Sequence, residues 1–280
     1  MSKKDSLFKI DVVPKEIIVD LLGPSAKGIG QGLGGIVNFI IGPLRKLNVI
    51  NEKSYEDFIQ KVNDKSDPIP ESERDSSKLG IALKIMEDAR FQLNEEQMRE
   101  YFANLLSNSI DKRKNGNISP RFSSILLDLS VKDASFLKKI YSSVLSTVPL
   151  SQIKFSDGKF PGIEQMVAEK IVLFTDEFLV NPIEFDTLYS LGLLKYDSDA
   201  ALSSKYYQDI YSNFLSSELY NSYTKQLNDL QLSNPNEGLT EINKYDGYIK
   251  LTELGAEFCK RIFLLIAIIN FSIQSFFKFI

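Results

Sequence analysis

Apolar side chains in the middle of the chain recur at intervals of three and four residues, the spacing of one face of an α-helix. Asn94 with Gln97 resembles a capping box at the start of one such stretch. Ser119-Pro120 and Ser130 mark two further helix starts, each followed by its own apolar face. The face of the first helix consists of Met98, Tyr101, Phe102, Leu105, Leu106 and Ile110. Three consecutive capped helices predict a helical bundle.

Shorter elements are predicted in the C-terminal third. Asn181-Pro182 opens a short helix that ends at Ser190. Two strands are predicted at residues 191–196 and 248–251, and Thr252 caps a final helix. Helix, strand, strand, helix is the order found at the end of a winged-helix module. The insertion between the two strands, residues 199–237, contains Tyr206, Tyr207, Tyr211, Phe214, Tyr220 and Tyr223.

The remaining segments carry weaker signals. Residues 14–22 predict a short helix, because Pro14 suits a first turn and the following apolar residues share one face. Residues 52–78 are polar, contain Pro68 and Pro70, and resemble a linker or extended connection. Residues 151–175 show no clear period, and we expect a loop there.

These patterns predict a mainly α fold, in which a helical bundle is followed by a C-terminal winged-helix-like module with a small β-hairpin. Four segments are expected along the chain. They are residues 1–50, an N-terminal helix with a glycine-rich hydrophobic segment; residues 51–78, a linker; residues 79–175, the helical bundle; and residues 176–280, the winged-helix-like module with its aromatic insertion and a hydrophobic C-terminal helix.

The composition restricts the chemistry that the chain can perform. It contains no histidine and one cysteine, Cys259. The missing histidine excludes Ser-His-Asp and Cys-His catalysis and every imidazole metal site. A single cysteine excludes an intramolecular disulfide and a thiolate zinc site, and it fits a reducing cytoplasm. No positioned set of carboxylates stands out either. We therefore expect a non-enzymatic protein without cofactor or metal, and the N-terminus shows no signal peptide.

Charge is distributed unevenly along the chain, although the net charge is only -4. Residues 1–48 carry seven bases and four acids, whereas residues 176–260 carry 14 acids and six bases. The candidate recognition helix of the winged-helix-like module, residues 182–190, contains Glu184 and Asp186 but no lysine or arginine. Because phosphate contacts supply most non-specific DNA affinity, nucleic acid is not expected as a partner. We interpret the module as a protein-interaction or dimerisation element.

Closely spaced glycines between residues 28 and 35 allow two interpretations. Gly30, Gly32 and Gly35 match G-x-G-x-x-G, but a dinucleotide site needs a preceding strand, and residues 15–22 have helical spacing. The second interpretation uses the four-residue interval, because a stripe of small residues lets another backbone approach closely. The helix would then be a packed core helix, or a membrane-active or self-associating one. The candidate interaction residues are Gly28, Gly30, Gly32 and Gly34.

The C-terminal run of residues 262–280 is the second hydrophobic segment, and Lys260-Arg261 precede it. Its 19 residues are at the lower limit for a transmembrane helix. Only residues 262–269 are uniformly apolar, and polar residues interrupt the second half. A buried or partner-facing helix and a membrane attachment therefore both stay open. The candidate interaction residues here are Ile262, Phe263, Leu264 and Leu265.

Several short sequence motifs occur in a characteristic order along the chain. They are residues 24–28 with 42–46, residues 68–70, residues 101–108 with 119–122 and 129–134, and residues 191–194 with 251–258. This ordered set, which spans residues 12 to 260, resembles the abortive infection alpha family of bacterial proteins. The family often has a His-Pro pair where this chain has Ser119-Pro120. The resemblance implies a role in phage defence by abortive infection, and it implies no known catalytic residue.

Two mechanisms are consistent with these observations. In the first, the glycine-rich and C-terminal segments associate with or perturb the membrane, which places a cytoplasmic protein at or in the inner face of the cell membrane. In the second, a soluble sensor or adaptor binds a phage or host protein through the winged-helix-like module. A protein partner or self-association is expected in both.

Overall fold

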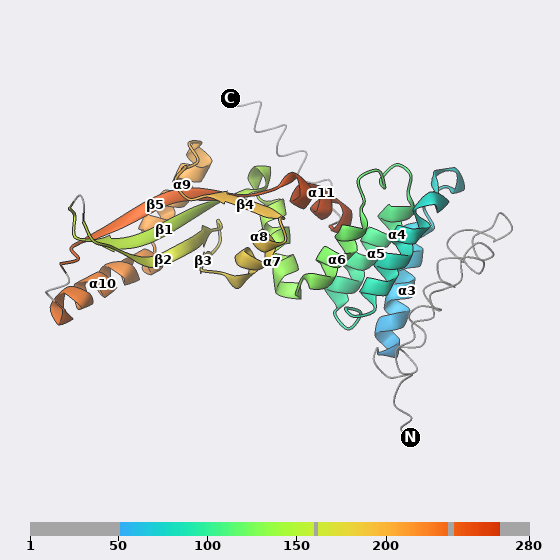
Figure 1. Ribbon diagram of the computed structural model, residues 1–280, viewed down its shortest axis with the longest axis horizontal. Helices are drawn as coiled ribbons and strands as arrows, with labels where there is room; N and C mark the ends of the chain where they lie inside the picture. Colours follow the sequence, from blue (N-terminus) through green and yellow to red (C-terminus); the bar gives the residue numbers. More distant parts are fainter. Residues whose placement is uncertain (1–50, 160–161, 235–237, 264–280) are drawn as a thin grey trace, which may run out of the picture. The chain divides into compact units, whose positions relative to one another are not determined.

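The computed structural model describes residues 51–159, 162–234 and 238–263 (Figure 1). The chain divides into two compact units. Unit 1 comprises Met1–Asp128 together with Arg261–Ile280, and unit 2 comprises Leu129–Lys260. Unit 2 is therefore inserted into the sequence of unit 1.

Helices form the described part of unit 1, and α5 packs against α3, α4 and α6. The helices are α3 (Glu52–Ser66), α4 (Leu79–Ala89), α5 (Glu96–Ile110) and α6 (Pro120–Asp128), with the short 3-10 turns η1 (Glu71–Glu73) and η2 (Ser76–Lys78) between α3 and α4. Phe58 of α3, Met86 of α4 and Phe102 of α5 are among the buried side chains. Burial of such apolar side chains is the main favourable term in forming this core.

The segment that we interpreted as a linker, residues 51–78, contains α3. Asn51 caps this helix, because its side-chain oxygen accepts a hydrogen bond of 2.9 Å from the backbone N–H of Lys53. Tyr55, Phe58 and Val62 form the buried stripe. The stripe is narrow and most other positions are polar. The overall composition of this amphipathic helix is therefore close to that of a linker, which explains the different interpretation from the sequence.

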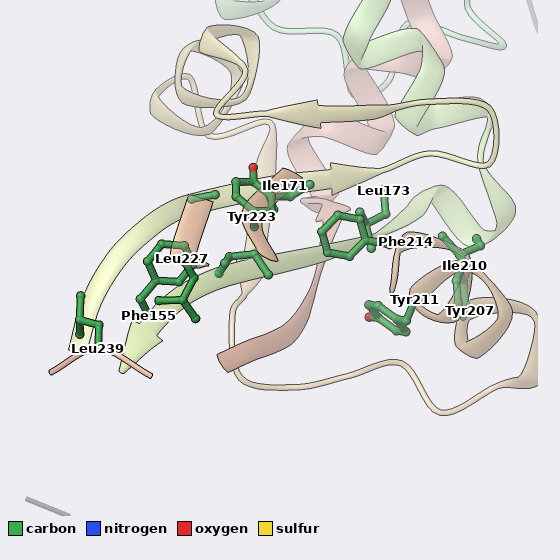
Figure 2. Packing of buried hydrophobic residues seen from close by; sticks show 12 residues of the cluster. Phe155, Ile171, Leu173, Tyr207, Ile210, Tyr211, Phe214, Tyr223, Leu227 and Leu239 are labelled. Atoms are coloured by element: carbon green, nitrogen blue, oxygen red, sulfur yellow. The ribbon is translucent and has the colours of Figure 1, made fainter. Parts of the chain in front are cut away.

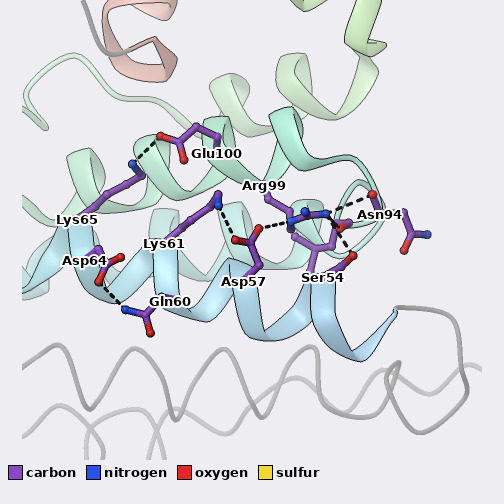
Figure 3. A network of polar contacts seen from close by, with 10 residues as sticks. Ser54, Asp57, Gln60, Lys61, Asp64, Lys65, Asn94, Arg99 and Glu100 are labelled. Carbon is purple, nitrogen blue, oxygen red and sulfur yellow. Dashed lines mark hydrogen bonds and ion pairs between the residues drawn. The ribbon is translucent and has the colours of Figure 1, made fainter. Parts of the chain in front are cut away.

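Arg99 connects α3 to the turn before α5 (Figure 3). The guanidinium is largely buried, and its Nε lies 2.6 Å from the carboxylate of Asp57. Its Nη1 donates to the backbone carbonyls of Leu93 and Asn94 at 2.8 and 3.3 Å. Lys61 adds a second cation to Asp57, at 2.5 Å. The planar fork of arginine thus bonds a carboxylate and two carbonyl groups at once, which a lysine could not do.

Unit 2 is built around an antiparallel sheet (Figure 1). Within the described residues the sheet has five strands in the order β3-β2-β1-β5-β4. The strands are β1 (Thr147–Ser156), β2 (Glu164–Leu173), β3 (Phe178–Val180), β4 (Leu194–Asp197) and β5 (Glu241–Leu251). The central strand is β1, which pairs with β5 from Thr147↔Lys250 to Ser156↔Glu241.

The predicted mainly α fold with a small hairpin is therefore wrong, and the chain has a mixed helix and sheet architecture. Residues 151–175, for which we expected a loop, contain most of β1 and all of β2. Two features of β1 hide the strand period. Pro149 lies within the strand, and the register with β2 shifts on either side of Ile153. A β-bulge of this kind breaks the alternation of inward and outward residues that identifies a strand.

Five further helices belong wholly or mostly to the described part of unit 2. They are α7 (Val131–Ser142), α8 (Ile183–Ser190), α9 (Lys205–Leu215), α10 (Glu218–Ser233) and α11 (Glu253–Ile262), of which the last two residues are counted with unit 1. The helix start expected at Ser130 is confirmed, and Ser130 and Asp133 form a capping box there, with bonds of 3.1 and 2.8 Å. Asn94 does not cap α5, which follows Glu95 without a side-chain cap bond.

The elements expected at the end of a winged-helix module occur in the predicted order, and β4 pairs with the end of β5. Thr252 caps α11, because its Oγ1 accepts a hydrogen bond of 2.9 Å from the N–H of Gly255. The insertion between these strands folds as α9 and α10, which pack on one face of β1 and β2 (Figure 2). The expected hairpin is thus one edge of a larger sheet.

Candidate functional site

The candidate interaction residues that the sequence suggested fall into two groups. Gly28, Gly30, Gly32, Gly34, Leu264 and Leu265 lie outside the described residues. Ile262 and Phe263 are described, and their exposed fractions are 0% and 5%. The ring of Phe263 meets the ring of Tyr101 edge-to-face, with the centroids 5.0 Å apart. Both residues therefore belong to the core of unit 1.

Two asparagines of α5 hold this part of the chain. The Nδ2 of Asn104 donates to the backbone carbonyl of Ile262 at 2.9 Å, and the Nδ2 of Asn108 donates to that of Arg261 at 2.8 Å. The last carbonyl groups of a helix have no partner within the helix. The two amides supply partners for the end of α11, from positions 158 and 153 residues away in sequence.

The aromatic insertion mainly fills the core of unit 2. Tyr211, Phe214 and Tyr223 are buried against β1 and β2 (Figure 2). The hydroxyl of Tyr211 donates to the carbonyl of Gly247 at 2.6 Å, and burial raises the pKa of Tyr211 to about 12. Tyr206 is only half-buried, and together with Tyr207 it reaches a cavity at the edge of the core.

This α7–α9 cavity has a volume of about 470 Å³. It lies where the end of α7, the following turn, the start of β1, the end of β2 and the start of α9 meet. The apolar lining consists of Val144, Val148, Pro149, Leu173 and Ile210, and the aromatic lining of Phe174, Tyr206 and Tyr207. The polar lining consists of Lys139, Ser142, Ser143, Thr147, Thr175 and Asp176. The volume and the mixed lining are typical of a small-ligand or side-chain binding site.

Lys139 carries the positive charge of the cavity wall. Its Nζ lies 2.8 Å from the carboxylate of Asp176 and 2.6 Å from that of Glu177, and it is 4.4 Å from the centre of the Phe174 ring. Burial lowers the pKa of Lys139, but the hydrogen bonds to Asp176 and Glu177 outweigh this effect and raise it overall. The hydrogen bond from Lys139 lowers the pKa of Asp176. Lys139 and Asp176 therefore stay charged near neutral pH. The positive charge of the wall is balanced by the two carboxylates that Lys139 bonds.

Three hydroxyl groups around the cavity donate to the protein backbone. Ser143 Oγ donates to the carbonyl of Lys139 at 2.9 Å, and Thr147 Oγ1 donates to that of Leu145 at 3.0 Å. Tyr207 Oη donates to the carbonyl of Val144 at 2.8 Å. Burial raises the pKa of Tyr207, so its hydroxyl keeps its proton. Each oxygen has used its only proton and retains its capacity to accept a hydrogen bond.

The turn beside the cavity has an unusual backbone. Leu145 and Ser146 have φ angles of +52° and +47°, a region that residues other than glycine rarely occupy. Leu145 is 69% exposed and Val144 is 45% exposed, although both are large apolar residues. Strained backbone costs about 1–3 kcal/mol per residue and persists where surrounding bonds fix it, often beside binding sites. Here the bond from Tyr207 to Val144 is one such constraint.

Three other kinds of feature were expected or considered from the sequence, and the described ranges bear on each of them. No group of three or more His, Cys, Asp or Glu side chains in them is arranged to hold a metal ion. Cys259 is fully buried, and burial raises the pKa of its thiol. Within the same ranges, no helix combines the length and apolar character needed to cross a bilayer. The α7–α9 cavity thus offers binding surface, with charges that are already paired.

Sequence reasoning missed this cavity, since its lining comes from five separate elements and forms no motif. The one available signal was the pair Tyr206-Tyr207, which stood out as part of the aromatic insertion. The sequence of a tyrosine pair does not show which of the two rings is buried in the core and which is exposed to a cavity. Likewise, no glycine marks the left-handed turn at Leu145 and Ser146.

Comparisons with known proteins give one positive result. A protein-family model described as Abortive infection alpha matches residues 50–262. Searches of curated proteins and of solved structures gave no match. The matched range includes almost every described residue, from α3 to α11, and covers well over half of the chain. The chain therefore belongs to the abortive infection alpha family, and this membership indicates a role in abortive infection defence.

Proposed function

We propose that this protein takes part in antiphage defence by binding a phage or host molecule in the α7–α9 cavity, without catalysing a reaction itself. The observation that carries the proposal is the cavity of about 470 Å³ with paired charges, aromatic walls and an exposed apolar rim. Family membership supports the defence part, and the cavity supports the binding part. The protein would then act as a sensor or adaptor.

The surroundings of the cavity favour a preformed site. Its walls belong to the central strand β1, to β2 and to two helices that pack on the sheet. The lining residues fixed by the core are Val148, Pro149, Leu173, Phe174, Tyr207 and Ile210, which are all buried. Preorganised sites lose less conformational entropy on binding than sites on disordered segments do. Val144 and Leu145 add exposed apolar surface at the rim, which a bound partner would cover.

Filling the cavity tests this proposal. Ser142 and Thr175 are exposed lining residues, so Ser142→Phe and Thr175→Phe should occupy the cavity without disturbing the core. Ser135→Phe is the matched control, because Ser135 is an exposed serine on α7 that does not line the cavity. The host is a phage-sensitive strain in which the unmodified protein lowers plaque formation. We expect both filling variants to raise plaque counts by about tenfold or more, and the control to protect normally.

Folding and cell survival complete this experiment. All three variants should melt within a few degrees of the unmodified protein, so that lost protection reflects the cavity. Counting surviving infected cells tests the abortive mode, in which infected cells die or arrest. Full protection by both filling variants, with their folds intact, would show that the cavity is not where the defence molecule binds.

Membrane association is the second candidate, and the apolar residues 264–269 are the observation behind it. This segment continues the apolar run that begins at Ile262, but Ile262 and Phe263 themselves lie in the core of unit 1. A membrane-binding segment would therefore begin at residue 264. Fractionation of cells should place the full chain in the membrane pool and a chain that ends at Phe263 in the soluble pool. Finding both chains in the soluble pool would eliminate this candidate.

A further inference from the structure

We infer that the α7–α9 cavity binds an uncharged aromatic ring that carries a hydrogen-bond donor, as an indole or a phenol does. The inference rests on the proposed function, because it names the chemical class that the same cavity recognises. It follows from three properties of the lining, namely its charge balance, its rings and the direction of its hydrogen bonds.

The charge balance favours an uncharged group. Lys139 is the lysine in the cavity wall, and it is already bonded to Asp176 and Glu177. An anionic ligand would have to compete with two carboxylates for this cation. A cationic ligand would have to displace Lys139 from both carboxylates and from its position over Phe174. A neutral group enters without either exchange and avoids the desolvation penalty of a buried charge.

The rings favour an aromatic group. Phe174, Tyr206 and Tyr207 supply three aromatic walls, and Leu173 and Ile210 supply the apolar surface beneath them. The rings of Tyr206 and Tyr207 already meet edge-to-face at 5.0 Å, and those of Phe174 and Phe136 do so at 5.7 Å. An additional ring would extend these contacts, and aromatic pairs contribute beyond the area that they bury.

Three of the six hydroxyls in the lining favour a donor on the ring. The hydroxyls of Ser143, Thr147 and Tyr207 all donate to backbone carbonyls, so what they offer a ligand is lone pairs. The carboxylate of Asp176 likewise only accepts. An indole N–H or a phenol O–H is matched to such a surface, whereas a ring without a donor leaves these acceptors without a bond from the ligand.

Two sources could present this ring, a tryptophan or tyrosine side chain of a protein or a free aromatic molecule. A nucleotide is disfavoured, because its phosphate would approach Asp176 and Glu177 with no unpaired cation in the lining. The experiment therefore compares four probes. They are N-acetyl-tryptophanamide, its 1-methylindole analogue, a short peptide with one central tryptophan, and adenosine monophosphate.

The chain contains no tryptophan, so indole fluorescence excited at wavelengths that tyrosine does not absorb reports the probe alone. On titration with the full-length protein, we expect the emission of N-acetyl-tryptophanamide to shift to shorter wavelength with saturation. The 1-methylindole analogue keeps the amide groups but lacks the N–H donor on the ring, and its affinity should be about threefold to tenfold lower. Tighter binding of the peptide than of the free amide would indicate a protein source, and equal affinity would indicate a free aromatic. Equal affinity of the methylated analogue would overturn the donor requirement.

Protein variants separate this inference from the proposed function. The double variant Ser143→Ala with Thr147→Val removes two acceptors, and it should weaken the amide but leave the methylated analogue unchanged. Ser142→Phe should abolish binding of both probes, and Ser135→Phe should abolish neither. If the filling variants lose protection in the plaque assay while no indole binds, the function stands and the ligand class is wrong. Adenosine monophosphate that binds more tightly than the amide would also contradict the inference.

Discussion

At the residue scale, Arg99 combines several roles that are usually distributed over more than one side chain. Its guanidinium neutralises Asp57 and bonds two backbone carbonyls in the turn before α5. Removal of Arg99 would leave these carbonyls without this donor and Asp57 with Lys61 as its remaining cation. This residue is therefore the place in unit 1 where a single substitution should be most informative about polar stabilisation.

We expect Arg99→Ala to lower the free energy of unfolding by about 1–3 kcal/mol, because two backbone carbonyls lose a charged donor and Asp57 keeps only Lys61. Arg99→Lys should recover part of the loss, since an ammonium keeps the charge but not the fork. Lys65→Ala is the matched control. Lys65 bonds the partly exposed carboxylate of Glu100 at 2.7 Å, a single ion pair without the backbone bonds of Arg99, so its loss should be below ~1 kcal/mol. Urea denaturation of the three variants measures the difference, and equal losses for Arg99 and Lys65 would contradict this account.

Asp57 should also make the stability of the protein depend on pH. Burial raises the pKa of Asp57, but hydrogen bonds and charges from Lys61 and Arg99 outweigh burial and lower it below its ordinary value of 3.8 in the folded state. A lowered folded-state pKa contributes stability that is present above the unfolded value and is lost as the pH falls through the folded value. The difference in unfolding free energy between the unmodified protein and Asp57→Asn should therefore shrink from about pH 5 downward. A difference that stays constant to about pH 3 would show that Asp57 is not the responsible group.

At the scale of elements, the approach of α11 to Leu193, the residue before β4, depends on one glycine. A Cβ atom built on Gly255 would lie 2.1 Å from the carbonyl oxygen of Leu193, a backbone atom that cannot rotate away. Gly80 in α4 is the contrasting case, because a Cβ there would meet nothing within 4 Å. Both glycines lie in helices. Comparing the same substitution at the two positions therefore separates the effect of close packing from that of helix propensity.

We expect Gly255→Ala to destabilise the protein by about 1–3 kcal/mol, because the helix must move away from Leu193. Gly80→Ala should stabilise it by up to ~1 kcal/mol, since alanine has the higher helix propensity and no contact opposes it. Thermal melting of both variants measures the opposite signs. A neutral or stabilising Gly255→Ala would show that α11 does not need this close approach.

The sequence predicted those elements whose signals are local. Ser130 with Asp133 and Thr252 mark helix starts through side-chain bonds to nearby backbone groups, and the structure has both caps. It could not predict β1 and β2, because their stability depends on partners elsewhere in the chain. Ser151 in β1 bonds Asp246, 95 residues away, and neither residue shows locally that it belongs to a sheet. The α7–α9 cavity was missed for the same reason, since β1 supplies part of its wall.

At the scale of the whole molecule, the C-terminal run divides at Phe263. Ile262 and Phe263 are buried in unit 1, so the core of that unit needs residues from both sides of the unit 2 insertion. The hydrophobic run in the sequence is continuous across this point. Ile262 and Phe263 therefore belong to the core of unit 1, although nothing in the sequence separates them from the rest of the run.

Truncation at two nearby positions tests this division. A chain that ends at Phe263 should melt close to the full-length protein. A chain that ends at Arg261 lacks two core side chains and should lose several kcal/mol of stability, at ~1.5–3 kcal/mol for each buried side chain. Its melting temperature should fall sharply, or the protein should aggregate. Equal melting of the two truncated chains would show that Ile262 and Phe263 do not support the core.

The insertion of unit 2 into unit 1 also sets an order of events during synthesis. Asn104 and Asn108 leave the ribosome early, but the carbonyls they bond belong to residues 158 and 153 positions later. Closing a loop of this length costs conformational entropy. Contacts between residues that are far apart in sequence therefore form slowly during folding. Unit 1 must therefore wait, with two polar side chains and part of its apolar core uncovered, until all of unit 2 has been translated. The growing chain is exposed to chaperones and proteases for that interval, and its assembly ends with the residues that Asn104 and Asn108 bond.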